Sequence, residues 1–213
     1  MSEAHMIAGH QMHGEGHSAE LVEQSPFALP SKKLAIWLFI IADAATFAAM
    51  LVAYGFIRNA DPNWPRPFHS IANVAPMTLI LLTSSLTMLF GVQAAYAGNK
   101  KAAIRWVLFT ALLAAIFALL HIREWFGLIG EGLTLSKNPW GGSQLFGATF
   151  YGVTGLHLLH VIGGFFVLLF VTQRYNSGRY DANHIETAGL YWHFVDLVWM
   201  FVVPLVYLLN FSR

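Results

Sequence analysis

Five long apolar segments constrain the fold of this chain more than any other feature. They cover residues 34–57, 76–96, 103–126, 145–172 and 188–210. Each reaches the roughly 20 residues that an α-helix needs to cross the hydrocarbon core of a bilayer. Only 11% of the 213 residues are charged, against about 25% in soluble domains. The sequence therefore predicts an all-α membrane protein, a bundle of five transmembrane helices.

Basic residues near the segment ends indicate the orientation of this bundle. Cytoplasmic loops carry an excess of lysine and arginine. With a cytoplasmic N-terminus, the cytoplasmic side holds Lys32, Lys33, Lys100, Lys101, Arg105, Arg174 and Arg179, and the opposite side holds Arg58, Arg66, Arg123, Lys137 and Arg213. We therefore expect a cytoplasmic N-terminus and a periplasmic C-terminus.

Residues 1–30 differ from the rest of the chain and predict a polar tail in front of a membrane domain at 31–213. The tail holds His5, His10, His13 and His17. Histidine-rich tracts can take up copper or zinc, but spacings of five, three and four residues match no closed site. We favour a solvated tail. The chain has no cysteine, which excludes thiolate copper centres, and its net charge of +1 does not favour binding to nucleic acid.

Three acidic residues lie inside apolar segments: Asp43, Glu124 and Asp196. Asp43 is near the middle of the first segment, where a lone carboxylate costs on the order of 2.5–3.5 kcal/mol. It is either a proton-linked or partner-facing acid, or a neutral acid bonded to a neighbouring helix. Glu124, near the outer end of the third segment, is either a further buried, proton-linked acid or a side chain that reaches the membrane surface.

The fourth and fifth segments carry polar pairs at helical spacing. His157 and His160 share one helix face, as do His193 and Asp196. Antiparallel neighbours would bring His160 and Asp196 to similar depths, which suggests a buried polar network that fixes helix packing. The alternative is haem ligation by His157 with His121 or His193 across helices. We favour structural histidines.

Five stretches, in order, resemble the helices of subunit III of the haem-copper respiratory oxidases: LAIWLFIIADAATFAAMLVAY, MTLILLTSSLTMLFGVQAA, LLHIREWF, ATFYGVTGLHLLHVIGG and HIETAGLYWHFVDLVW. The resemblance runs from about Leu34 to Leu209. The family usually has glutamate at the position of Asp43, and glutamine is more usual at His121.

The resemblance implies the five-helix form of a subunit without redox centres, embedded in the bacterial cytoplasmic (inner) membrane. Its partners would be catalytic subunit I and subunit II, which hold the haem and copper. It would hold phospholipids in a cleft between the first two core helices and the rest. Arg174 and His184 would lie near lipid phosphate, and Trp37 beside the cleft. The alternative for Arg174 is that it only anchors the cytoplasmic end of its helix, as basic residues commonly do.

The leading interpretation is therefore a non-catalytic accessory subunit of a proton-pumping terminal oxidase, which stabilises the catalytic subunit and its proton uptake. It holds no metal or other cofactor of its own. Two alternatives stay open: a haem-b membrane anchor of a dehydrogenase, and the related accessory subunit of nitric oxide reductase.

Overall fold

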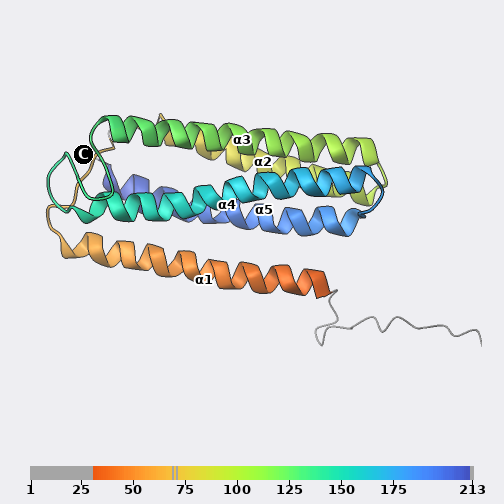
Figure 1. Cartoon of the computed structure of the whole chain (residues 1–213), viewed down its shortest axis with the longest axis horizontal. Helices are drawn as coiled ribbons and strands as arrows, with labels where there is room; N and C mark the ends of the chain where they lie inside the picture. Colours follow the sequence, from red (N-terminus) through yellow and green to blue (C-terminus); the bar gives the residue numbers. More distant parts are fainter. Residues whose placement is uncertain (1–30, 69, 71, 212–213) are drawn as a thin grey trace, which may run out of the picture.

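The computed structural model describes residues 31–211 except 69 and 71, and the side chains from residue 33 onward. The expected polar tail, with its four histidines, lies outside the described residues. Within them, five helices are long and apolar enough to cross a membrane, which confirms the five-helix prediction. These are α1 (Ser31–Ala60), α2 (Val74–Tyr96), α3 (Lys100–Gly130), α4 (Leu145–Asn176) and α5 (Ala182–Val202), and the chain continues into the short turns η1 (Val203–Tyr207) and η2 (Leu208–Asn210) (Figure 1).

Helices α3 and α5 begin before their apolar segments because polar residues cap them. Asp181 precedes α5, and its carboxylate accepts from the backbone N–H of His184. Asn99 caps α3 in the same way, accepting from the N–H of Ala102 at 3.1 Å. Such caps satisfy backbone donors that the first helical turn leaves unpaired. Helix α5 accordingly starts at residue 182 rather than at the predicted 188.

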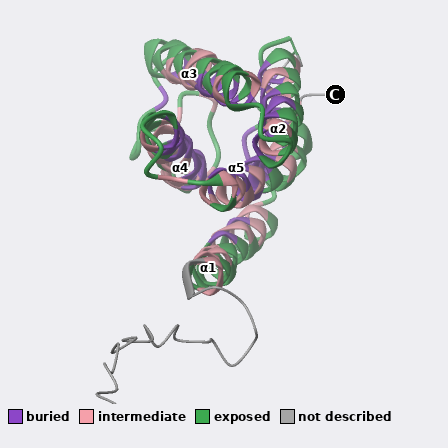
Figure 2. Cartoon of the chain, turned by 90° about the vertical axis from the view of Figure 1, so that its right-hand side faces the viewer, coloured by how far each residue is buried: buried purple, intermediate pink, exposed green. Residues whose placement is uncertain are grey.

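Helices α2 to α5 surround one core, and α1 lies against its outside (Figure 2). The aromatic stretch of α5 fills much of that core, with Trp192 and Trp199 fully buried. The Trp192 indole N–H donates to Ser84 at 3.0 Å, and that of Trp199 donates to Thr78 at 3.1 Å. The hydroxyl side chains of α2 thus pair the only polar atoms of the two tryptophans.

Helix α1 buries little of its own surface. In its most apolar 18-residue window 6% of residues are buried, against 33–50% in the other four spans. Its contact stripe includes the buried side chains of Phe47 and Tyr54. We call the end of the bundle where α1 begins the Lys33 end, and the opposite end the Asn210 end.

Polar contacts fasten α1 at both ends of the bundle. At the Lys33 end, Lys33 Nζ lies 2.7 Å from a carboxylate oxygen of Glu186 on α5. At the Asn210 end, Arg58 donates to the Asn210 side chain at 3.2 Å and to the Leu209 carbonyl at 2.7 Å. Asn210 is buried and also donates to the Tyr54 hydroxyl. These contacts fix the position of a helix that has few buried side chains.

The last turns of the chain are irregular because of Pro204. Proline has no backbone N–H and its ring clashes with the preceding helical turn. Here η1 is a single wide π-helical turn, and η2 is a tight 3₁₀ turn. Both Tyr207 and Asn210 point into the bundle from these turns and are fully buried.

Candidate functional site

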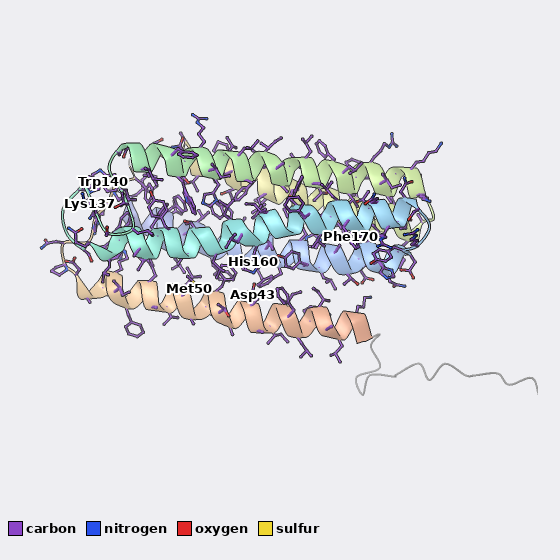
Figure 3. All side chains as sticks on the ribbon, in the orientation of Figure 1. Asp43, Met50, Lys137, Trp140, His160 and Phe170 are labelled. Carbon is purple, nitrogen blue, oxygen red and sulfur yellow. The ribbon has the colours of Figure 1, made fainter. Side chains whose placement is uncertain are left out.

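The acid in the middle of α1 pairs with a histidine of α4. Asp43 is the thirteenth of 30 residues in α1, and its Oδ2 lies 3.0 Å from Nε2 of His160. Figure 3 shows the two side chains between the helices. Their exposed fractions are 14% and 15%. The contact has the length of an ion pair without the direction of a linear hydrogen bond.

The other nitrogen of His160 determines the proton content of this pair. Nδ1 lies 2.7 Å from the carbonyl oxygen of Leu156. A carbonyl can only accept, so Nδ1 carries a hydrogen. In a neutral ring Nε2 would then present a lone pair to Asp43, and a carboxylate would repel it. The pair must therefore hold one additional proton, as imidazolium and carboxylate or as imidazole and carboxylic acid.

His193 and Asp196 belong to a different contact. His193 Nδ1 lies 3.1 Å from the hydroxyl of Ser85 on α2. The same hydroxyl interacts with Asp196, which is 7% exposed. The structure thus brings His193 and Asp196 to α2, whereas His160 faces α1. The four residues proposed as a network are therefore divided among three contacts: His193 and Asp196 with α2, His160 with α1, and His157 with α3.

Glu124 meets the end of the chain rather than the membrane surface. One carboxylate oxygen accepts from the Tyr207 hydroxyl at 2.8 Å. Tyr207 is fully buried and is placed by the wide turn at Pro204. Glu124 and its neighbours Arg123 and Glu131 line a hollow of about 580 Å³ at the Asn210 end.

His121 and His157 approach each other, as the haem alternative requires, with ring centroids 6.5 Å apart. Two aromatic side chains pack against both rings. Phe117 lies 5.6 and 5.8 Å from the two rings, and Trp199 lies 5.3 and 5.0 Å from them. Both imidazoles are fully buried. A porphyrin between them would have to displace this aromatic packing, so His121 and His157 do not fit a haem.

The three residues expected to bind lipid lie at or toward the Lys33 end. Arg174 places its guanidinium 5.1 Å above the Phe170 ring. His184 stacks on Tyr180 with ring centroids 4.1 Å apart. Trp37 is 44% exposed, to the side of the α1 contact stripe.

His184 also belongs to the cap of α5. Its Nδ1 lies 2.6 Å from Oδ1 of Asp181. This hydrogen bond from the His184 side chain lowers the pKa of the Asp181 carboxyl. The histidine therefore has a structural partner at the same place where a lipid phosphate was expected.

Apolar grooves run along both flanks of α1. One, of about 570 Å³, is lined by Met50, Trp125 and α4 residues from Tyr151 to Ile162, with Gly152 and Gly155 in its floor. The other, of about 290 Å³, lies between α1 and α5 and includes Ala48, Phe194 and Phe201. Their linings suit acyl chains. They follow α1 alone, because α2 packs with α3 and α5.

Sequence reasoning missed the polar contacts at the two ends of α1. Lys33 with Glu186 and Arg58 with Asn210 join residues more than 150 positions apart. A basic residue in the last helical turn, such as Arg58, was the available signal. Among residues 31–211, without 69 and 71, no group of three or more His, Cys, Asp or Glu side chains could hold a metal ion.

Comparison with known proteins extends over most of the chain. Residues 21–211 match the family model for cytochrome c oxidase subunit III. Cytochrome c oxidase subunit 3 of Synechocystis is 37% identical over 180 residues, 81% of this chain and 73% of the relative. A probable cytochrome c oxidase subunit 3 of Nocardia farcinica is 34% identical, covering 81% and 84%. Subunit 3 of the cytochrome bo(3) ubiquinol oxidase of Pseudomonas aeruginosa is 31% identical, covering 82% and 83%.

Proposed function

Because this chain belongs to the cytochrome c oxidase subunit III family, we propose that it is the non-redox accessory subunit of a proton-pumping haem-copper terminal oxidase. Its partners are catalytic subunit I and subunit II, which carry the haem and copper. The complex lies in the bacterial cytoplasmic membrane, with the Lys33 end of the bundle inside. Since the relatives serve both cytochrome c and ubiquinol oxidases, the proposal concerns the role common to both.

The Asp43–His160 pair carries the proposal of a proton-linked role. A carboxyl group at the middle of a membrane helix is expensive unless it is paired or neutral. Here the carboxyl group lies 3.0 Å from the imidazole, and the pair holds one additional proton. The pair can therefore hold a proton inside the membrane at no net charge. We propose that it helps to sustain proton uptake by the catalytic subunit during turnover.

The grooves beside α1 support the second part of the proposal, that this subunit holds phospholipid. Both grooves have almost purely apolar linings. Arg174, at the Lys33 end, supplies a positive charge at the depth of lipid head groups, where anionic lipids attract basic side chains. Bound lipid would cover apolar side chains of α1 that the bundle leaves exposed.

Removing this subunit from the oxidase tests the proposal directly. The depleted complex should keep its haem spectra and its initial rate of oxygen consumption, and then lose activity during turnover faster than the intact complex. Adding back the wild-type chain should restore the durability. Loss of the haem signal together with this chain would contradict a non-redox role. A haem absorption band in the purified chain would favour the haem-anchor alternative instead, and co-purification with nitric oxide consumption would favour the reductase alternative.

A further inference from the structure

Buried polar atoms without a protein partner gather at one place in the bundle. Among the described residues eight buried side-chain nitrogen or oxygen atoms have no hydrogen-bond partner, and five of them belong to His121, His157 and Trp125. The three rings are in contact: His121 lies 5.7 Å from Trp125 and 6.5 Å from His157, between centroids. The unpaired atoms therefore form one cluster at the interface of α3 and α4.

The two imidazoles of this cluster are closed off from lipid and from the ends of the bundle, whereas Trp125 also lines the apolar groove between α1 and α4. His121 and His157 are both 0% exposed, and Phe117 and Trp199 pack against both rings. Buried polar groups nearly always have a partner, and an unpaired one is costly. A partner that reaches all these atoms must be small.

The separation of the rings selects the kind of partner. A ring nitrogen lies roughly 1.1 Å from the centroid and a hydrogen bond is about 2.8–2.9 Å long, so two imidazoles bonded directly would have centroids about 5 Å apart. Two rings bridged by one water at a tetrahedral angle would sit roughly 6.5 Å apart. The observed 6.5 Å is too long for direct bonding and matches the bridge.

Charge distinguishes a water from a metal cation, which two imidazoles could also bind at this separation. The titratable side chains that interact with His157 are the imidazoles of His121 and His160, and no described carboxylate is among them. The electrostatic environment of His121 is dominated by its burial, with no contribution from a described carboxylate. A cation at this place would be buried among apolar side chains without a negatively charged neighbour, which is unfavourable. A neutral molecule that both donates and accepts suits two imidazoles, one in each role.

We propose that a buried water molecule binds between His121 and His157 and joins α3 to α4, with the indole N–H of Trp125 as a further donor beside it. Buried waters of this kind make two to four hydrogen bonds to otherwise unpaired groups. This site is distinct from the Asp43–His160 pair and from the proposed function, because His157 contacts His121 of α3 and Trp199 of α5, whereas His160 contacts Asp43 of α1.

A high-resolution cryo-microscopy map of the intact oxidase tests the proposal. It should show one density peak within about 3.2 Å of a nitrogen of each ring. Elemental analysis of the same preparation should show equal copper and zinc content in the wild type and in a His121→Leu/His157→Leu variant. Directly bonded rings, an empty interface, or metal that the double variant loses would each overturn it.

A double-mutant cycle on the intact complex gives a second measurement. His121→Leu or His157→Leu alone leaves the other ring without its bridge, so each should increase the fraction of complexes that lose this subunit on heating. The double variant should lose no more subunit than the worse single variant. Thr154→Val is the matched control on α4, because this buried hydroxyl bonds its own helix at Phe150. The losses of subunit caused by Thr154→Val and His121→Leu should add in the variant that carries both. If the losses caused by His121→Leu and His157→Leu also added, the bridge would be contradicted.

Discussion

Nε2 of His160 and Oδ2 of Asp43 lie 3.0 Å apart, at the distance of an ion pair, between α4 and α1. Together the two side chains must hold one additional proton. This requirement follows from the other side of the ring, where Nδ1 donates to the Leu156 carbonyl. Removing either side chain would leave the other without its oppositely charged or polar neighbour on the facing helix inside the membrane. The pair thus links the placement of α1 to the presence of a proton.

Substitution of Asp43 separates these two roles. In Asp43→Asn the amide can donate to Nε2, so α1 should stay in place, whereas Asp43→Leu should weaken its attachment by about 0.6–2 kcal/mol. Thermal release of the subunit from the complex measures attachment. If the proton matters, Asp43→Asn should bind normally and still shorten the life of the oxidase during turnover. If the Asp43→Asn complex lost activity during turnover no faster than the wild type, the proton-linked role would be contradicted.

Asn210 is predicted to hold the other end of α1. Its side chain accepts from Arg58 and donates to the Tyr54 hydroxyl and the Val206 carbonyl. Asn210→Leu leaves these buried groups unpaired and should lower the stability of the subunit by about 1–3 kcal/mol. The thermal denaturation midpoint is the measurement. Arg66→Ala, at an exposed position in the α1–α2 connector, is the control and should leave the midpoint unchanged.

Two neighbouring glycines of α4 should respond differently to the same substitution. A Cβ at Gly164 would lie 2.9 Å from the Trp192 ring, whereas a Cβ at Gly163 would have its nearest neighbour at 3.8 Å. Because Trp192 is fully buried and held by Ser84, Gly164→Ala should cost about 1–3 kcal/mol through overpacking. Gly163→Ala should be tolerated. Equal midpoints for the two variants would show that Trp192 moves freely.

Filling the groove between α1 and α5 should displace lipid. Ala48 lines this groove, whereas Ala49 is exposed and points about 100° away around the helix. Ala48→Trp should reduce the number of phospholipids that co-purify with the complex, as counted by mass spectrometry. Ala49→Trp adds the same volume without entering the groove. Identical lipid content in the two variants would argue against lipid at this place.

The cap of α5 should depend on pH through Asp181. The hydrogen bond from His184 lowers the pKa of this carboxyl in the folded chain, below about 3.9 in the unfolded chain. The cap therefore contributes its full stabilisation above pH 4, and the contribution disappears as the pH falls through the lowered pKa. Asp181→Ala should cost about 1 kcal/mol at neutral pH.

Asp181→Asn provides the control for this pH dependence. Asparagine is an equally good cap and does not titrate in this range. Its denaturation midpoint should match that of the wild type at neutral pH and should decrease less on acidification. A wild-type midpoint that follows the asparagine variant down to pH 3 would contradict the role of the Asp181 charge.

The sequence was sufficient to predict the five helices, because the number and length of apolar segments leave few alternatives in a bilayer. Depth along the membrane was also predictable, which is why Asp43 was placed near the middle. The position of each side chain around the bundle could not be predicted from the sequence. Equal depth suggested His160 as a neighbour of Asp196, but the partner depends on which helix lies alongside, and α1 packs against α4 and α5.

The caps and the ends of α1 show a second limit. Asp181 and Asn99 extend their helices into polar sequence, where hydropathy gives no signal. Arg58 and Asn210 meet only because the odd number of helices brings the end of α1 and the end of the chain to the same side. Such contacts depend on topology, which no local pattern records.

The wide turn at Pro204 has a consequence for the length of the chain. A π-helical turn is geometrically a regular helix with one additional residue. Deleting Pro204 should therefore straighten the helix while Tyr207 still reaches Glu124 and Asn210 still reaches Tyr54. The irregular end of this protein can thus be understood as a one-residue insertion that leaves the contacts of Tyr207 and Asn210 intact.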